Sequence, residues 1–446
     1  MLTLQGYKID KTNVPNLIQL KTALTVKPYI PSVFVKPQYV QKYPVFVETK
    51  DHIFVPKHYG IAEFGLPKTS ERDIPKTPLE FWKFEGKIRE NQVEVVNSYL
   101  TPEPRDGIIS LQTGGGKTVC ALFIASKIQV PTIVLVHNTF LRDQWIERIR
   151  AFLPKARIGT LQADVVDIAN KDITVAMLQS VALKEYPPGT FERFGFVIVD
   201  ECHHIASEAF SRAVPKLTCK HMLGLSATPE RKDRLMCVIN WFLGPMLYKS
   251  DTSDKVDEKV KVEVYEFTGD EKFNEIIYNN SGVMFTTLMI NKVVEYAPRN
   301  IMVAGLIEDL SQEEGRQLLV LTDRVGHTKT LFDLLPDHMK DTACILGRDV
   351  PAKTRTDWCA SKKILIATYQ MVKEGFDVAT LNTLIMATPR PDIEQIVGRI
   401  LRVEKKSRKL DPLIVDIVDE SFRRQFQVRN GLYKERGYGV TKMELL

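Results

Sequence analysis

The sequence predicts an α/β protein in which two parallel sheets, each with helices on both faces, follow one another along the chain. Two series of short apolar runs alternate with helical stretches, and a charged segment at residues 250–261 separates them. The residues before the first series are rich in proline and predict a small β-rich N-terminal domain. We therefore expect domains at residues 1–80, 81–250 and 301–446, with residues 251–300 as a linker or bridging segment.

The apolar runs that we expect to form strands are short and rich in β-branched residues. In the first unit they are Gly107–Leu111, Thr132–Val136, Ile173–Ala176, Phe196–Val199 and Met222–Ser226. In the second unit they are Gln317–Leu321, Thr342–Leu346, Lys363–Ala367, Leu384–Ala387 and Leu413–Ile417. Among the intervening stretches, Thr139–Phe152 has apolar residues at helical spacing, as Phe84–Tyr99 does ahead of the first strand. Strands and helices that alternate in this way indicate parallel sheets.

The N-terminal segment, residues 1–80, contains two alternating runs, Val45–Thr49 and His52–Val55, that are typical of short strands. Lysines are interleaved here with aromatic residues between Tyr29 and Phe46. Two interpretations remain open. Nucleobases could stack on the aromatic rings beside a basic track, or the lysines could simply solvate the surface of a small core.

The composition, with 44% hydrophobic and 26% charged residues among 446, is that of a globular protein of about three domains. Its apolar runs are shorter than the roughly 20 residues of a membrane span, and its N-terminus lacks the regions of a signal peptide. Six scattered cysteines argue against a disulfide framework or zinc site and indicate a reducing compartment, so we expect a cytoplasmic protein. Because the apolar runs are short, we also expect no membrane partner. The net charge of +6 permits a nucleic-acid partner without requiring one, and the sequence does not predict the oligomeric state.

The stretch Ile108–Thr118 has the pattern of a phosphate-binding loop, because an apolar run leads into Q-T-G-G-G-K-T and an apolar helix follows. In such a loop the backbone amides face the phosphates, the lysine reaches the β- and γ-phosphates, and the threonine hydroxyl can ligate Mg²⁺. Leu111 stands where the strict pattern has glycine, so a glycine-rich turn before a helix is the alternative. The residues expected to bind the nucleotide here are Gln112, Thr113, Gly114, Gly115, Gly116, Lys117 and Thr118.

An acidic pair follows the apolar run Phe196–Val199 directly, in the sequence D-E-C-H-H. Asp200 is placed to hold Mg²⁺ together with Thr118, and Glu201 is placed to activate the attacking water as general base. The alternative is an acidic pair that only caps the strand end. The two histidines that follow lack a third ligand at usable spacing for a metal site.

Two further motifs accompany the phosphate-binding loop and the acidic pair. Leu225–Pro229 reads L-S-A-T-P, and its two hydroxyl side chains can exchange hydrogen-bond partners near the acidic pair. In the second unit, Gln395, Arg399 and Arg402 lie at i, i+4 and i+7, so a helix would present all three on one face. Planar donors suit the charge that develops on a γ-phosphate, although an exposed basic helix face is the alternative.

In their order and spacing these motifs, with the E-G-F-D stretch that ends at Asp377, resemble those of superfamily 2 helicases of the DEAD/H type. Ile88–Gln92 resembles the adenine-side motif, and L-R-D-Q-W resembles the first nucleic-acid motif. D-E-C-H-H combined with Q-x-x-G-R-x-x-R looks like the XPB-like branch, and the N-terminal segment looks closest to phage branch-migration and large-DNA-virus members. The resemblance spans about residues 85–420.

The resemblance implies two RecA-like domains that use ATP and Mg²⁺. The catalytic residues that it implies are Lys117, Asp200, Glu201, Gln395, Arg399 and Arg402. Arg89 and Gln92 would recognise adenine, and Gly375 and Asp377 would contact the nucleotide. The residues expected to contact a nucleic-acid backbone lie around His137-Asn138, Gln179-Ser180, Thr322-Asp323-Arg324 and Thr368.

The implied activity is that of an ATP-dependent DNA helicase or translocase that remodels branched or forked DNA without sequence preference in viral replication, recombination or repair. Residues 1–80 would recognise the DNA substrate. An RNA helicase, or a helicase that releases transcripts from a polymerase, is the alternative within the class. A nucleotide-gated scaffold without hydrolysis is the alternative outside it.

Overall fold

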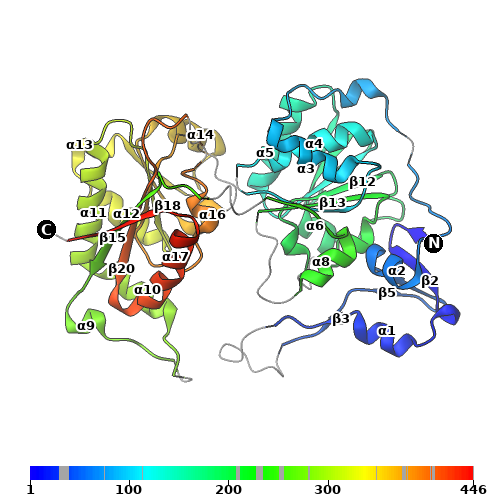
Figure 1. Cartoon of the computed structure of the whole chain (residues 1–446), viewed down its shortest axis with the longest axis horizontal. Coiled ribbons are helices and arrows are strands. Elements are labelled where there is room, and N and C mark those ends of the chain that lie inside the picture. The colour runs from blue at the N-terminus through cyan, green and yellow to red at the C-terminus, as the bar shows by residue number, and fades with distance from the viewer. Residues whose placement is uncertain are drawn as a thin grey trace. The chain divides into compact units, whose positions relative to one another are not determined.

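The computed structural model divides into two compact units, Met1–Ser250 and Asp251–Leu446 (Figure 1). This division falls at the boundary that the sequence predicts at residue 250. The structure describes residues 1–29, 40–74, 76–112, 114–206, 211–227, 235–250, 256–279, 282–347, 349–373, 378, 380–401, 403 and 407–444.

The main sheet of unit 1 has eight strands in the order β10-β9-β11-β8-β12-β13-β7-β14. All neighbouring pairs are parallel except β9 and β10, which form an antiparallel hairpin at one edge. The strands are β7 (Gly107–Ser110), β8 (Thr132–Val136), β9 (Ile158–Gln162), β10 (Val165–Asp167), β11 (Ile173–Met177), β12 (Phe196–Val199), β13 (His221–Ser226) and β14 (Met246–Lys249). The five strands predicted for this unit are confirmed, with ends that shift by a residue. The hairpin and β14 were not predicted.

Helices cover both faces of this sheet, as Figure 1 shows. The first face carries α3 (Glu90–Leu100), α4 (Lys117–Ile128) and α5 (Thr139–Phe152), and the second carries α6 (Leu178–Leu183) and α8 (Met236–Leu243). Because side chains alternate along a strand, Ile109 packs in the core with α4, whereas its neighbour Ile108 packs in the core with α8. Short 3₁₀ turns are Leu79–Trp82, Cys202–Ala206 and Val214–Lys216.

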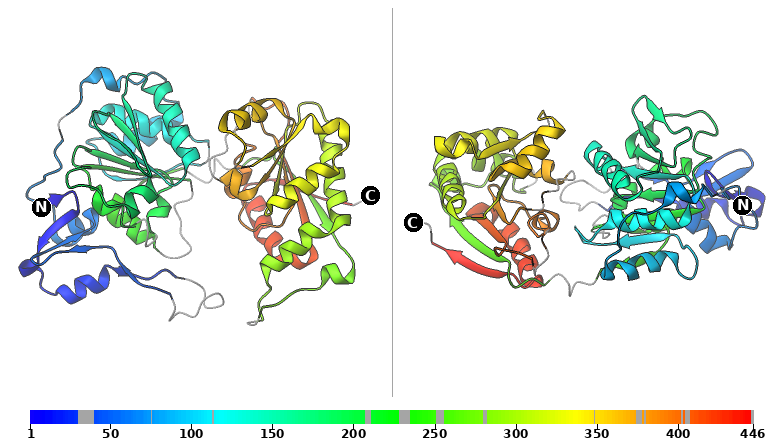
Figure 2. Two further views of the ribbon diagram at one scale, coloured as in Figure 1. Left: turned by 180° about the vertical axis from the view of Figure 1, so that it is seen from behind. Right: turned by 90° about the horizontal axis from the view of Figure 1, so that it is seen from above.

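The N-terminal segment forms a small antiparallel sheet of order β1-β2-β6-β5 and a separate two-stranded ribbon, β3 with β4. Its elements are β1 (Leu2–Thr3), β2 (Gly6–Asp10), a 3₁₀ turn (Lys11–Asn13), α1 (Leu17–Ala23), β3 (Thr25–Val26), β4 (Tyr43–Pro44), β5 (Val47–Glu48), β6 (His52–Val55) and α2 (Lys57–Phe64). In Figure 1, and from behind in the left view of Figure 2, this N-terminal module lies on the α8 side of the main sheet.

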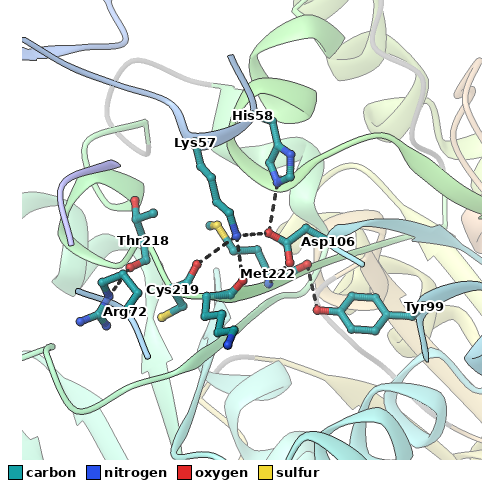
Figure 3. Close-up of polar contacts among 9 residues, drawn as sticks. Lys57, His58, Arg72, Tyr99, Asp106, Thr218, Cys219 and Met222 are labelled. Atoms are coloured by element: carbon teal, nitrogen blue, oxygen red, sulfur yellow. Dashed lines mark hydrogen bonds and ion pairs between the residues drawn. The ribbon is translucent and has the colours of Figure 1, made fainter. Parts of the chain in front are cut away.

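The N-terminal module shares a hydrophobic core with the rest of unit 1. Leu24, Ile53 and Val55 are buried in the same cluster as residues of α6 and α8. The module is also joined to the main sheet by buried polar contacts (Figure 3). Lys57 Nζ donates to Asp106 Oδ2 at 2.5 Å and to the carbonyl of Lys220 at 2.7 Å, and the Arg72 guanidinium donates to backbone carbonyls. The predicted β-rich segment is therefore an integral part of unit 1.

The sheet of unit 2 has seven strands in the order β17-β18-β16-β19-β20-β15-β21, and all neighbouring pairs are parallel. The strands are β15 (Lys261–Phe267), β16 (Leu318–Thr322), β17 (Ala343–Leu346), β18 (Ile364–Thr368), β19 (Thr383–Met386), β20 (Leu413–Asp419) and β21 (Gly439–Met443). The helices are α9 (Glu271–Asn274), α10 (Thr286–Glu295), α11 (Ala297–Gln312), α12 (Val325–Leu334), α13 (Asp337–Lys340), α14 (Ala352–Ser361), α15 (Tyr369–Lys373), α16 (Glu394–Val397) and α17 (Arg423–Glu435), with a 3₁₀ turn at Glu420–Phe422.

The sequence-based expectation of a linker or bridging segment over residues 251–300 needs correction. Residues 261–267 form β15, which lies inside the sheet between β20 and β21. Val262 and Val264 are fully buried, and the glutamates at positions 263 and 266 obscured the apolar character of this strand in the sequence. No helix in the described part of the chain is long and apolar enough to cross a membrane.

Candidate nucleotide site

The predicted phosphate-binding loop joins the carboxyl end of β7 to the N-terminus of α4. Gly114 and Gly116 both have φ of +84°, a backbone conformation that favours glycine. A Cβ atom on Gly116 would also lie 2.1 Å from Gln92 Nε2. The loop therefore requires glycine for its conformation and its close packing, and α4 directs its N-terminal amides toward the space that a phosphate group would occupy.

The lysine and threonine of the loop lie in the first turn of α4. Lys117 Nζ lies 3.4 Å from the carbonyl oxygen of Leu111 and 3.9 Å from Glu201 Oε1. Thr118 is half-buried beside it. Leu111 is buried among α3 and α4, so the residue that replaces the usual glycine contributes to the core. Thr113 lies outside the described residues.

The acidic pair follows β12, the strand that lies two places from β7 in the sheet. Asp200 is buried, and its Oδ1 accepts a hydrogen bond from the Glu201 amide at 3.0 Å. Burial, and next the Glu201 carboxylate, raise the pKa of Asp200, while Lys117 acts in the opposite direction. A divalent cation beside this carboxylate would favour its charged form, so the residue fits a Mg²⁺ ligand.

Glu201 has φ of +47°, an unusual backbone conformation for a residue other than glycine. Such strain is often found at functional sites. The Oε1 atom faces Lys117, whereas Oε2 is buried and accepts no hydrogen bond from the residues that the structure describes. His203 Nδ1 lies 3.5 Å from this Oε2 and 3.4 Å from Ser226 Oγ, so it links the acidic pair to the L-S-A-T-P motif. Thr228 of that motif lies outside the described residues.

Trp145 is a site residue that the sequence analysis placed in the helix Thr139–Phe152 and at the end of the motif L-R-D-Q-W, but not at the acidic pair. Its indole Nε1–H, on α5, donates to Asp200 Oδ2 at 2.9 Å, and the side chain is fully buried. The bond orients the carboxylate that we expect to hold Mg²⁺. The tryptophan that ends L-R-D-Q-W was the only signal for this contact in the sequence.

We expect Trp145→Phe to raise the Mg²⁺ concentration needed for half-maximal ATP hydrolysis by about 10-fold, and by no more than about 100-fold. The reason is that loss of a hydrogen bond to a metal ligand typically costs this much in metal affinity or activity. A Mg²⁺ titration of ATPase activity would measure the change, with Trp241→Phe on α8 as a control tryptophan. An unchanged Mg²⁺ requirement would contradict a role for Trp145 in orienting Asp200.

The predicted adenine residues lie at the start of α3, beside the phosphate-binding loop. Gln92 is buried; its Oε1 accepts from the Arg89 amide at 3.1 Å, and its Nε2 donates to the Gly115 carbonyl at 3.2 Å. Arg89 is exposed. Gln92 thus contacts the loop that would bind the phosphates. Recognition of adenine by this pair stays a prediction.

In unit 2 the expectation of one continuous helix through Gln395 and Arg399 is wrong. Helix α16 ends at Val397, and the chain continues as turns with i→i+3 bonds, from the Arg399 amide to Ile396 and from the Ile400 amide to Val397. A glycine at position 398 favours this early end. Gln395 and Arg399 are both half-buried, while Ile396, Val397 and Ile400 pack in the core. The other residues predicted here, Gly375, Asp377 and Arg402, lie outside the described residues.

The residues expected to contact a nucleic-acid backbone in unit 1 lie at the carboxyl ends of adjacent strands β8 and β11. Gln179 Nε2 lies 3.5 Å from the His137 carbonyl, and Ser180 Oγ accepts from the Ala163 amide at 3.0 Å. Asn138 caps α5. The two predicted loops are therefore neighbours, and both lie at the edge of the sheet that also carries the phosphate-binding loop.

In unit 2 the corresponding residues follow the adjacent strands β16 and β18, where Thr322 and Thr368 are paired in register. Thr322 is fully buried, and its hydroxyl contacts His327 Nδ1 at 2.7 Å, so it supports the loop and does not reach a ligand. The Arg324 guanidinium is bound to Asn291 Oδ1.

A phosphate-binding loop and an acidic pair at the carboxyl edge of a parallel sheet define a nucleoside triphosphatase domain. Comparison with known proteins agrees with this assignment to a nucleoside triphosphatase domain. The family described as type III restriction enzyme, res subunit, matches residues 85–231. The chain is 30% identical over 453 residues to the putative ATP-dependent RNA helicase L396 of Acanthamoeba polyphaga mimivirus, covering 99% of this chain and 86% of the relative.

A second viral relative and a solved structure extend the comparison. The chain is 26% identical to the putative helicase 161L of Invertebrate iridescent virus 6, covering 85% of this chain and 88% of the relative. The structure of S. cerevisiae Dbp5 bound to RNA and ADP BeF3 matches with a TM-score of 0.56 at 16% identity, covering 80% of this chain and 90% of that one, which shows the fold alone. The chain belongs to the superfamily 2 helicases, ATP-dependent enzymes that act on nucleic acid, and its units are tandem RecA-like domains.

Proposed function

We propose that the chain hydrolyses ATP with Mg²⁺ in order to move on DNA and remodel branched or forked substrates. The observation that carries this proposal is the arrangement of Lys117, Asp200 and Glu201 around one phosphate-binding loop. Family membership supports ATP use and a nucleic-acid substrate. The choice of branched DNA rests on the motif resemblance described above.

In the proposed mechanism Thr118 and Asp200 hold the cation, which would neutralise charge on the β- and γ-phosphates when bound. Lys117 would bind the same phosphates. Glu201 would accept a proton from the attacking water, since its Oε1 lies 3.9 Å from Lys117 Nζ, beside the place where the γ-phosphate would bind. We propose that Gln395 and Arg399 of unit 2 stabilise the charge that develops on the γ-phosphate.

A second candidate is an RNA helicase, including one that releases transcripts from a polymerase. The name of the mimivirus relative, a putative ATP-dependent RNA helicase, favours this candidate. The motor residues would be the same in both, because phosphate contacts position a strand without reading its sequence.

The test is the ATPase rate of the full chain at fixed salt without nucleic acid and with single-stranded DNA, duplex DNA, forked DNA or single-stranded RNA. We expect forked DNA to stimulate most, with an affinity that falls linearly on a log–log plot against salt concentration, because phosphate contacts dominate such binding. Stimulation by RNA that equals or exceeds stimulation by DNA would favour the second candidate. No stimulation by any of them would count against a motor that acts on nucleic acid alone and would favour a helicase that requires a polymerase complex.

A further inference from the structure

Unit 1 contains a pocket where the N-terminal module meets the loop that follows α6. Its volume is about 410 Å³, within the usual size range of ligand pockets. Four segments line it: residues 4–5 after β1, residues 44–47 at β4 and β5, residues 185–191 after α6, and residues 211, 212, 215 and 216. The site described above uses none of these residues.

The walls of this pocket are apolar and aromatic. Phe46 and Tyr186 are half-buried, and Phe191 is buried with its ring 5.0 Å from the Tyr186 ring, edge to face. Pro187 and Pro188 are exposed at the pocket. Flat faces of this kind bind flat ligands by stacking, and every nucleobase has such a face.

The charged groups of the pocket favour an anionic ligand. Arg212 is exposed and lines the pocket, and Lys216 lies beside it. Lys216 Nζ donates to the Lys184 carbonyl at 2.7 Å, and Glu185 lies 3.5 Å from it, so its charge is partly compensated. Arg212, whose side chain is exposed at the pocket, is the cation that we assign to a phosphate group of a ligand whose base enters the pocket.

The pocket is continuous with the loop that we expect to contact the nucleic-acid backbone. The Tyr186 hydroxyl donates to the Ser180 carbonyl at 3.0 Å, and Ser180 follows Gln179 at the carboxyl end of β11. A strand whose phosphates lie along that loop would have its next bases within reach of the wall that Tyr186 forms.

We propose that this pocket binds an unpaired nucleobase of the nucleic-acid strand, stacked on Phe46 and Tyr186, with Arg212 on the adjoining phosphate. This inference rests on the proposed function and adds to it a feature of the substrate, an unstacked base held by the N-terminal module. A free nucleotide is the other occupant that the test addresses.

The test compares the affinity of the full chain for two single strands of equal length, one of thymidines and one with abasic sites at every position. Both carry the same phosphates, so their affinity ratio isolates the contribution of the bases. We expect Phe46→Ala to reduce this ratio by about 5- to 150-fold, the range for loss of one stacked base. Phe46→Leu, which keeps an apolar side chain for packing, should reduce it similarly. Leu66→Ala, an exposed position of the N-terminal module outside the pocket, should leave the ratio unchanged.

Arg212→Glu should weaken binding of both strands equally. The slope of log affinity against log salt, which is negative, should become less steep by about one. A ratio that is the same in wild type and both Phe46 variants would overturn the pocket inference while leaving the proposed function intact, provided that nucleic acid still stimulates the ATPase. Thymidine monophosphate that competes at the concentration of the whole strand would identify a free nucleotide as the occupant, which also overturns it. Binding of neither strand, without ATPase stimulation, would instead count against the proposed function itself.

Discussion

Replacing Glu201 by glutamine is expected to lower the rate of ATP hydrolysis by about 10²- to 10⁴-fold, because a positioned general base contributes about this much. Glutamine has nearly the same shape and can still face Lys117, but its neutral amide cannot take the proton of the attacking water. Binding of ATP should remain, since Lys117 and the glycine loop are unchanged. Steady-state phosphate release and equilibrium binding of a fluorescent ATP analogue would measure the two quantities separately.

The matched control is Asp200→Asn. We assign Asp200 to the cation and Glu201 to the water, so only the Asp200 variant should lose Mg²⁺-dependent tightening of nucleotide binding. At position 201 glutamate and glutamine have the same backbone and Cβ atoms. The Glu201→Gln substitution therefore adds no backbone strain at the positive φ of this residue. Turnover of Glu201→Gln at the wild-type rate would remove Glu201 from the role of general base.

The elements that the sequence predicts well are those in which one periodicity dominates. Strands such as β8 and β12 are continuous apolar runs, and α5 carries apolar residues at helical spacing, so all three have the predicted bounds. By contrast, β15 alternates valine with glutamate and was assigned to a linker, because its burial depends on β20 and β21, which lie far away in the sequence. The edge strand β10 has only three residues, two of them valines, and all three are exposed, so no alternation of buried and exposed positions marks it in the sequence.

The candidate site likewise contains features that local sequence patterns predict and features that depend on distant segments. The glycine loop and the acidic pair could be predicted because each requires particular residue types within a few positions. The bond from Trp145 to Asp200 and the packing of Gln92 against Gly115 join segments far apart in the chain, so local patterns could not reveal them. The integration of the N-terminal module into unit 1 belongs to this second kind, since Lys57 and Asp106 are 49 residues apart.

Lys57 and Asp106 form the contact whose disruption we expect to destabilise unit 1 most. Both side chains are less than 10% exposed, and Asp106 Oδ1 also accepts from the Met222 amide of β13 at 2.9 Å, while His58 Nε2 lies 3.1 Å from Oδ2 (Figure 3). Burial alone would raise the pKa of Asp106, but Lys57 and His58 together hold it below its usual value. The carboxylate is therefore charged at neutral pH.

Either Lys57→Met or Asp106→Asn should destabilise unit 1 by about 3–5 kcal/mol, because each leaves a buried charged group without its partner. For a unit of this size that corresponds to a fall in melting temperature of about 6–20 °C, measured by calorimetry. The double variant should lose much less than the sum of the two, since no unpaired charge remains and the introduced asparagine side chain can still accept from the Met222 amide. Additive losses would show that the two side chains are not coupled.

The pH dependence of the Asp106→Asn variant tests the same contact independently. A carboxylate whose pKa is lowered by folding contributes stability above its unfolded pKa, and this contribution is lost as the pH falls through the folded pKa. The stability difference between wild type and Asp106→Asn should therefore be full at pH 7 and shrink below the ordinary aspartate pKa of 3.8. A difference that stays constant into acid would assign the loss to packing. Deleting residues 1–80 cannot replace these variants, because it would also remove Leu24, Ile53 and Val55 from the shared core and unfold the unit whose substrate choice is in question.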